Sequence, residues 1–212
     1  TTRSDKMYED IANISVGIIN KIPGNVLCFF PSYEIRDRVY ENIKLLANKT
    51  IILEQPASSK KDRAELLEKF KSYSKSGSIL LAASTGSFSE GIDLPGDLLK
   101  AVIIVGLPLA QPNLETNELI RYYDEKFQKG WDYGYLMPAV IKTMQAAGRC
   151  IRSETDRGII AFIDERYLLP SYNKCFPKDW DMKTTTEPEK LVEEFFKNQQ
   201  SAKSYKYTFL IP

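Results

Sequence analysis

The chain has 212 residues and a formal charge of +1 at pH 7, because 29 basic side chains stand against 28 acidic ones. This length suits one domain with its own core, and the balanced charge means that any affinity for nucleic acid must come from a local arrangement of side chains. The absence of histidine excludes histidine general bases, Ser-His-Asp triads and histidine metal ligands.

Cysteine usage and apolar patterning bear on the compartment. Cys28, Cys150 and Cys175 are odd in number and far apart, which argues against a disulfide framework and a closed zinc or iron–sulfur site. No apolar leader follows Thr1, and the apolar residues 101–110 are interrupted by glycine and proline and are too short to span a bilayer. We therefore expect an intracellular protein, cytoplasmic or nuclear, without membrane contact. The chain starts without methionine, as a cut from a longer polypeptide or processing would leave it.

Short apolar, β-branched runs alternate with amphipathic stretches along the chain. The runs predict buried strands at residues 26–30, 51–53, 79–83, 101–105 and 159–163. Helical spacing groups Ile35, Val39, Ile43 and Leu46 on one face, then Leu66, Phe70 and Tyr73, then Leu119, Ile120, Tyr123 and Phe127. This alternation predicts an α/β fold, a parallel sheet with helices on both faces, whose ligands bind at the carboxyl ends of the strands.

The last part of the chain predicts one more helix and a strand. A helix is expected to start at Thr186, where Glu189 completes a capping box and Pro188 lies in the first turn, and to run towards Gln200. The apolar residues 205–211 are expected to add an edge strand, and residues 184–186 to form a surface connection. We predict a single domain, 1–212, with this helix and strand at 186–212.

Residues 145–152, QAAGRCIR, form the strongest motif, and they follow a helical run over residues 135–144. In a continuous helix, at about 100° per residue, Gln145, Arg149 and Arg152 fall within an arc of about 60°. Two guanidiniums one turn apart suit a polyphosphate, because arginine stays charged and offers planar, bidentate donors. The motif therefore indicates a phosphate-binding stripe.

The rest of this helix has an apolar face and a glycine. The apolar face is expected to anchor the helix in the core through Val140, Met144, Ala147 and Ile151. Gly148, beside the stripe, lets a ligand approach closely at a cost of about 1 kcal/mol in helix propensity. The alternative stays open that Arg152 pairs with Asp156 and that Arg149 is only solvated.

A second motif, residues 84–96 with the sequence STGSFSEGIDLPG, follows the predicted strand at 79–83. Glycines and small hydroxyls at the end of a strand free backbone N–H groups and supply short donors for a phosphate or sugar. Asp93 is suited to hold a ribose hydroxyl. The alternative is an ordinary turn in which Asp93 caps a neighbouring group.

Two segments resemble part of a nucleotide-binding motif but lack residues that such a motif requires. Gly86 and Gly91 have the glycine spacing of a P-loop, but Ile92 and Asp93 replace its lysine and hydroxyl residue. Residues 159–165 resemble a strand that ends in a magnesium-binding acid, yet no phosphate loop accompanies it. We therefore expect these 212 residues alone to hydrolyse no ATP, although a standalone ATPase using Asp164 and Glu165 stays open as a rival.

Three segments in order resemble helicase motifs IV, V and VI: residues 24–33 (GNVLCFFPSY), 90–93 (EGID) and 145–152. Within superfamily 2, their wording most resembles the XPD and DinG group, and XPD in particular. The resemblance implies a RecA-like second motor domain of an ATP-dependent DNA helicase that moves 5′ to 3′ on single-stranded DNA, with a role in nucleotide excision repair. The alternative is a RecA-like binding module without catalysis.

The resemblance also assigns roles to residues. Arg149 and Arg152 match the arginines at the γ-phosphate, with Arg152 as the arginine finger, and Gln145 matches the glutamine that positions their helix at the nucleotide. On the nucleotide side the resemblance adds Gly148, Gly91, Glu90 and Asp93. Asp93 matches the acid at the ribose, and Glu90 is found where many superfamily 2 members have arginine. On the DNA side it places the Thr85 hydroxyl at the DNA backbone, together with Gly86, Ser87, Ser32 and Tyr33.

The resemblance implies that ATP with Mg²⁺ is shared with the first motor domain of the same protein, which carries the P-loop and the four cysteines of an iron–sulfur cluster. The implied partners are single-stranded DNA, that first motor domain and other repair proteins. The sequence leaves open whether Trp131, Tyr133 and Tyr135 stack on bases or pack within the protein.

Overall fold

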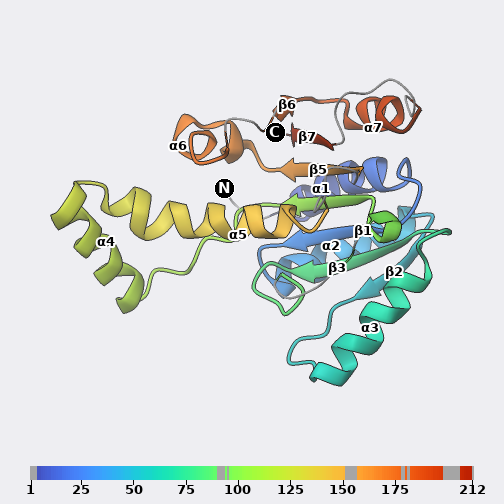
Figure 1. Cartoon of the computed structure of the whole chain (residues 1–212), viewed down its shortest axis with the longest axis horizontal. Helices are drawn as coiled ribbons and strands as arrows, with labels where there is room; N and C mark the ends of the chain where they lie inside the picture. Colours follow the sequence, from blue (N-terminus) through green and yellow to red (C-terminus); the bar gives the residue numbers. More distant parts are fainter. Residues whose placement is uncertain are drawn as a thin grey trace.

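A computed structural model describes residues 4–89, 94, 96–150, 157–177, 180, 182–197 and 206–211. In this part of the chain, seven parallel strands form one sheet in the order β2-β3-β1-β4-β5-β7-β6 (Figure 1). The strands are β1 (Val26–Phe30), β2 (Thr50–Leu53), β3 (Ser78–Ala83), β4 (Ala101–Val105), β5 (Gly158–Ile163), β6 (Met182–Thr184) and β7 (Lys206–Ile211). The five strands predicted from apolar runs are confirmed. The four central ones, β1, β3, β4 and β5, are buried on both faces and therefore need apolar residues throughout, whereas β2 lies at an edge and is only partly buried.

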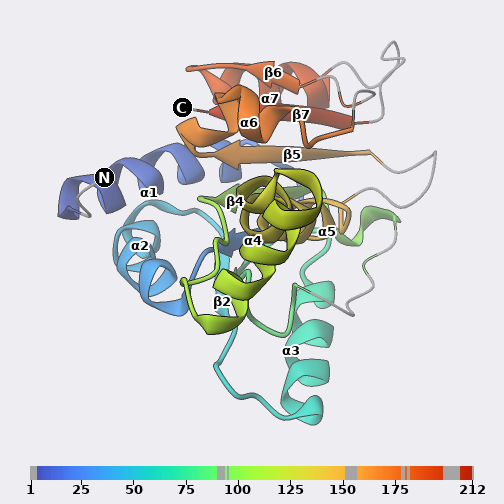
Figure 2. The same ribbon diagram turned by 90° about the vertical axis from the view of Figure 1, so that its left-hand side faces the viewer.

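Helices cover both faces of the sheet, as predicted (Figure 2). They are α1 (Asp5–Ile19), α2 (Tyr33–Leu46), α3 (Lys60–Ser72), α4 (Leu114–Phe127), α5 (Met137–Ala147), α6 (Pro170–Asn173) and α7 (Pro188–Lys197), with short helical turns at Gly96–Leu98, Asp132–Leu136 and Glu165–Leu168. Alternate residues of each strand point to opposite faces, so Cys28 belongs to the core layer that includes residues of α1, α2 and α7, whereas Phe29 belongs to the layer that includes residues of α3 and α5. The core therefore has two apolar layers, one on each side of the sheet.

Two of the predicted helix faces are only partly right. On α2, Ile35, Val39 and Ile43 are buried, but Leu46 at the end of the helix is 47% exposed. Helix α4 has no buried residue, and Phe127 is 55% exposed. The reason is its position: α4 lies beyond the end of the sheet and packs against the helical turn Asp132–Leu136 instead (Figure 1).

The C-terminal predictions are corrected in two places. Helix α7 begins at Pro188 and not at Thr186, and residues 198–200 lie outside the described part. Strand β7 is not an edge strand, because it pairs with β5 on one side and with β6 on the other. The edge strand on this side of the sheet is β6, part of which was predicted as a surface connection. Within the described residues, we find no helix with the length and apolar character needed to cross a membrane.

Candidate functional site

The loops that follow β1 and β3 meet at the carboxyl end of the sheet. The Ser84 N–H donates to the Phe30 carbonyl at 2.7 Å, which joins the start of the loop 84–89 to the end of β1. This is the edge where a parallel sheet binds its ligands. The last part of the predicted motif 24–33 therefore lies beside the start of the motif 84–96.

The inner side of the loop 84–89 rests on a carboxylate that the motifs did not include. Glu54, directly after β2, is 0% exposed, and its carboxylate accepts hydrogen bonds from the N–H groups of Ala83, Ser87 and Phe88 and from the Ser87 hydroxyl. One signal for it was in the sequence: an acidic residue at the carboxyl end of a predicted strand. Because Ser87 points inwards, both of its donors serve this carboxylate.

The outer side of the same loop faces α5 across a polar pocket of about 180 Å³. Its lining residues come from both elements: Ser84, Thr85, Gly86, Ser89, Lys142 and Gln145. Two predicted DNA-side residues, Thr85 and Gly86, therefore share a pocket with the predicted nucleotide-side residue Gln145. Lys142 is exposed and adds a cation that sequence reasoning missed, although it lies one turn before Gln145 on the same helix.

The predicted continuous helix through Arg152 is wrong, because α5 ends at Ala147. Gly148 is the C-cap, and the N–H groups of Arg149 and Cys150 donate to carbonyls three residues back, as in a tightened last turn. Glycine, which has a low helix propensity, stands where the helix stops. Arg149 therefore lies after the helix and not on a helical stripe with Gln145.

The burial of α5 agrees with its predicted apolar face. Val140 and Ala147 are buried and Met144 is partly buried against the same core layer, whereas Gln145 is exposed. Ile151 lies outside the described residues. The core thus holds α5 with Gln145 turned towards the pocket.

Arg149 joins the two motifs directly. Its Nη2 donates to the backbone carbonyl of Ser89 at 3.0 Å, and its side chain is half-buried. Other predicted residues of this region lie outside the described part of the chain: Arg152, Glu90, Gly91 and Asp93, and with them Asp156, the alternative partner of Arg152.

The first turn of α2 carries the two remaining predicted residues. Ser32 is the N-cap, and its hydroxyl accepts the Ile35 N–H at 3.3 Å. The guanidinium of Arg36 lies 4.7 Å from the centre of the Tyr33 ring. Burial, and then the nearby Glu54 carboxylate, raise the pKa of Tyr33, so the phenol stays neutral at physiological pH.

Asp164, the rival magnesium ligand, is already paired. Its carboxylate accepts the Arg166 N–H at 2.8 Å, and Arg166 Nη2 lies 2.6 Å from Oδ2. Asp164 caps the helical turn Glu165–Leu168 in this way. This arrangement is that of a structural cap and not of an open cation site.

The aromatic residues near α4 pack mainly on one another. Tyr133 makes edge contacts with Tyr123 and Phe127, and the Tyr135 hydroxyl donates to the Ala110 carbonyl at 3.0 Å. Trp131 lies against Tyr135, with ring centroids 4.4 Å apart, and is 55% exposed. Packing within the protein therefore accounts for Tyr133 and Tyr135.

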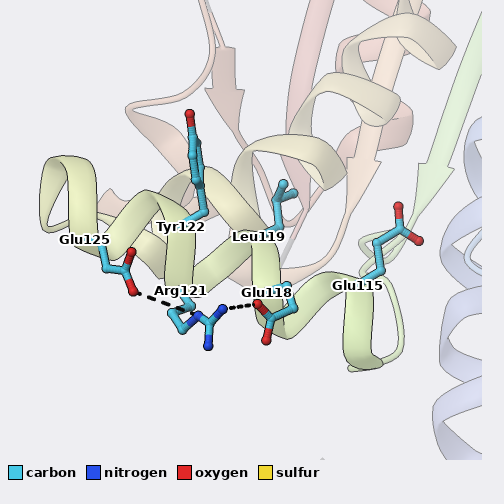
Figure 3. Close-up of a pocket in the computed structure, with 6 residues that line it drawn as sticks. All are labelled: Glu115, Glu118, Leu119, Arg121, Tyr122 and Glu125. Carbon is cyan, nitrogen blue, oxygen red and sulfur yellow. Dashed lines mark ion pairs between the residues drawn. The ribbon is translucent and has the colours of Figure 1, made fainter.

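A wider hollow of about 410 Å³ lies on α4, away from these motifs, as Figure 3 shows. All six lining residues belong to that one helix: Glu115, Glu118, Leu119, Arg121, Tyr122 and Glu125. Arg121 lies 2.5 Å from Glu118 and 3.9 Å from Glu125. Its charge is thus already neutralised, and the predicted site residues that the structure describes do not line this hollow.

A parallel sheet with helices on both faces, and polar loops gathered at its carboxyl end beside α5, is the architecture of a RecA-like domain. Residues 15–183 match the family of helicase C-terminal domains, and the chain belongs to that family. Within it, the chain is a C-terminal domain of the XPD and DinG group of superfamily 2 helicases.

Similar proteins agree with this assignment. The chain is 31% identical over 186 residues to the Fanconi anemia group J protein homolog of Gallus gallus, covering 78% of this chain and 15% of the relative. It is 37% identical over 152 residues to the ATP-dependent DNA helicase DinG of Photobacterium profundum, covering 70% of this chain and 22% of the relative. A solved XPD helicase structure has a TM-score of 0.66 and 28% identity, covering 82% of this chain and 31% of that one. The chain therefore spans less than a third of each protein.

Proposed function

We propose that this chain is the C-terminal motor domain of an ATP-dependent DNA helicase that moves 5′ to 3′ on single-stranded DNA and acts in nucleotide excision repair. The observation that supports this most is the pocket shared by the loop 84–89 and α5, together with the hydrogen bond from Arg149 to the Ser89 carbonyl. A loop for DNA and an arginine for the nucleotide, in direct contact, are what a motor that couples hydrolysis to movement requires.

On the nucleotide side, we propose that Arg152 is the arginine finger and that Arg149 stabilises charge on the γ-phosphate. Gln145 positions the end of α5, and the Gly148 cap lets the arginines turn towards the nucleotide. Glu90, Gly91 and Asp93 complete this side, with Asp93 at the ribose. ATP with Mg²⁺ is shared with the first motor domain, which supplies the magnesium ligands, because Asp164 is held by Arg166.

On the DNA side, we propose that the Thr85 hydroxyl and the Gly86 backbone contact the phosphates of one strand, with Ser32 and Tyr33 beside them. Lys142, which lines the same pocket, adds positive charge for the DNA backbone. Ser87 acts indirectly, since its donors serve Glu54.

The iron–sulfur cluster of the proposed enzyme belongs to the first motor domain. Cys28 and Cys150 lie in opposite core layers, so these two thiols cannot bind one cluster. Burial also raises the pKa of Cys28, which disfavours the thiolate that iron requires. The first motor domain and single-stranded DNA are the proposed partners, followed by other repair proteins.

The test uses the complete protein. We expect single-stranded DNA to stimulate its ATP hydrolysis, and we expect it to unwind a partial duplex with a 5′ single-stranded tail but not one with a 3′ tail. Unwinding from the 3′ tail alone would contradict the polarity. Tight DNA binding without any DNA-stimulated hydrolysis would support the RecA-like binding module instead.

A further inference from the structure

The buried carboxylate of Glu54 is the feature that the proposed mechanism has not used. Glu54 follows β2, and its own N–H donates to the Leu81 carbonyl at 3.0 Å, which extends the pairing of β2 with β3 by one residue. The side chain is therefore held rigidly beneath the loop 84–89. It is 0% exposed, and a carboxylate removed from water is strongly destabilising unless donors replace its hydration.

The donors come from the loop and from the strand residue just before it. The Ser87 N–H and hydroxyl donate to Oε1 at 2.7 and 3.0 Å, the Phe88 N–H donates to Oε1 at 3.3 Å, and the Ala83 N–H donates to Oε2 at 2.9 Å. Converging backbone N–H groups of this kind form an anion-binding concavity. Here the anion is a side chain of the protein itself, so the loop takes its shape around Glu54.

The loop also leaves space for this carboxylate at one position. A Cβ on Gly86 would lie 2.3 Å from Oε2 and 2.5 Å from Oε1 of Glu54, which no side chain tolerates without a shift. With the inward groups bound to Glu54, the residues left to line the outer pocket are Ser84, Thr85, Gly86 and Ser89. The carboxylate therefore decides which face of the loop is available to a ligand.

Glu54 also connects the loop to the first turn of α2. Arg36, which is 3% exposed, donates from Nη1 to the Glu54 backbone carbonyl. The same guanidinium lies over the Tyr33 ring. Through one residue, the segment that carries Ser32 and Tyr33 and the loop that carries Thr85 are held in a common arrangement.

We propose that Glu54 is a positioning residue that holds the loop 84–89 and the start of α2 in the conformation that grips DNA. The part of this inference that concerns DNA rests on the proposed function. The part that concerns the conformation of the loop 84–89 does not. Two experiments separate these parts.

The first experiment measures amide hydrogen exchange in the 212-residue chain. Glu54→Gln keeps the shape of the side chain but removes the charge and one acceptor oxygen, so the Ser87 and Phe88 amides should exchange about tenfold faster or more. The matched control is Glu65→Gln, the same change at an exposed position of α3, which should leave these amides unaffected. Unchanged exchange at Ser87 and Phe88 in Glu54→Gln would overturn the proposal.

The second experiment measures DNA-stimulated ATP hydrolysis by the complete protein. For Glu54→Gln, the DNA concentration that gives half-maximal stimulation should rise about tenfold, while the rate at saturating DNA changes less, by about threefold at most. A loss of stability alone would lower the rate at every DNA concentration and leave the half-maximal concentration in place. That pattern would count against a positioning role.

A double-mutant comparison tests the contact itself. Gly86→Ala should weaken DNA binding about tenfold in the normal protein, but much less in a Glu54→Ala background, where no carboxylate opposes the new methyl group. Equal effects in both backgrounds would refute the coupling. If the unaltered protein bound no single-stranded DNA, the proposed function would fail, and the exchange experiment would still decide whether Glu54 holds the loop.

Discussion

At the scale of single residues, Arg149 connects the proposed nucleotide side to the loop 84–89. Arg149 is half-buried and donates to the Ser89 carbonyl, so part of its role is to hold the loop 84–89. Arg152 is three residues further along in the sequence, and we propose it as the arginine finger from the helicase resemblance. Arginine is preferred over lysine in this role because its planar fork binds two phosphate oxygens at once.

The first prediction concerns Arg152→Ala in the complete enzyme. Turnover should fall by about a thousandfold or more, because an arginine finger acts on the phosphoryl group in the transition state. Arg152→Lys should restore little of it. The measurement is steady-state ATP hydrolysis with a melting curve, and Arg121→Ala, which removes an exposed arginine from α4, is the matched control. Near-normal DNA-stimulated turnover in Arg152→Ala would favour the salt bridge with Asp156.

Thr85→Ala should affect DNA binding more than the chemical step, the reverse of what we expect for Arg152→Ala. Thr85 lines the pocket, and we propose that its hydroxyl contacts DNA, so its removal should weaken binding of single-stranded DNA and DNA-stimulated hydrolysis more than basal hydrolysis. Fluorescence anisotropy with a labelled oligonucleotide, beside the ATPase assay, measures both. Unchanged affinity for DNA would remove Thr85 from the proposed interface.

A third prediction concerns the pH dependence of stability. Burial lowers the pKa of Lys49 to about 8, although its Nζ donates to the Ile22 and Gly24 carbonyls. Between pH 8 and the ordinary value of 10.5, the unfolded chain holds a proton that the folded chain has released, so stability from this group rises with pH. The difference in melting temperature between the unaltered chain and Lys49→Met should therefore grow in favour of lysine from about pH 7 to about pH 9.5. A constant difference would show that Lys49 keeps its ordinary pKa.

At the scale of elements, α3 and α4 have similar amphipathic patterns and different environments. Phe70 is 0% exposed and is the fully buried side chain by which α3 is anchored to the sheet. The equivalent apolar residues of α4 pack on the turn Asp132–Leu136 and leave Phe127 exposed. Local periodicity predicts that a helix has an apolar face, but not which surface that face meets.

This difference gives a matched pair of substitutions. Phe70→Ala should lower the free energy of unfolding by about 3–5 kcal/mol, because it removes a buried ring and leaves a cavity. Phe127→Ala should cost about 1 kcal/mol or less, since the ring is 55% exposed and the change removes ring contacts with Tyr123 and Tyr133. Urea denaturation of the two variants measures both values. Equal losses would place α4 in the core.

At the scale of the whole molecule, the proposed site is half of an active centre. The 212-residue chain should unfold in one cooperative transition but show no ATP hydrolysis, because the proposed function assigns the phosphate loop and the magnesium ligands to the other motor domain. Its affinity for ATP and for short single-stranded DNA should be weak, since each ligand spans two domains. Submicromolar binding of either ligand, or turnover that depends on Asp164, would contradict the half-motor.

The sequence by itself determined those features that depend on local chemistry. The buried strands β1, β3, β4 and β5 were predictable because parallel strands covered on both faces need unbroken apolar runs. The family was predictable from the wording and order of three motifs. The apolar face of α5 followed from helical periodicity.

Only the tertiary structure decided the features that depend on contacts between distant segments. The place of β7 inside the sheet depends on β6, whose three residues carry little pattern of their own. The position of α4 depends on what it packs against. The role of Glu54 depends on the loop 84–89, which lies about thirty residues away in the chain and is adjacent to it only because β2 pairs with β3. The sequence shows an acidic residue after a strand, but it does not show whether that carboxylate meets water or the N–H groups of a distant loop.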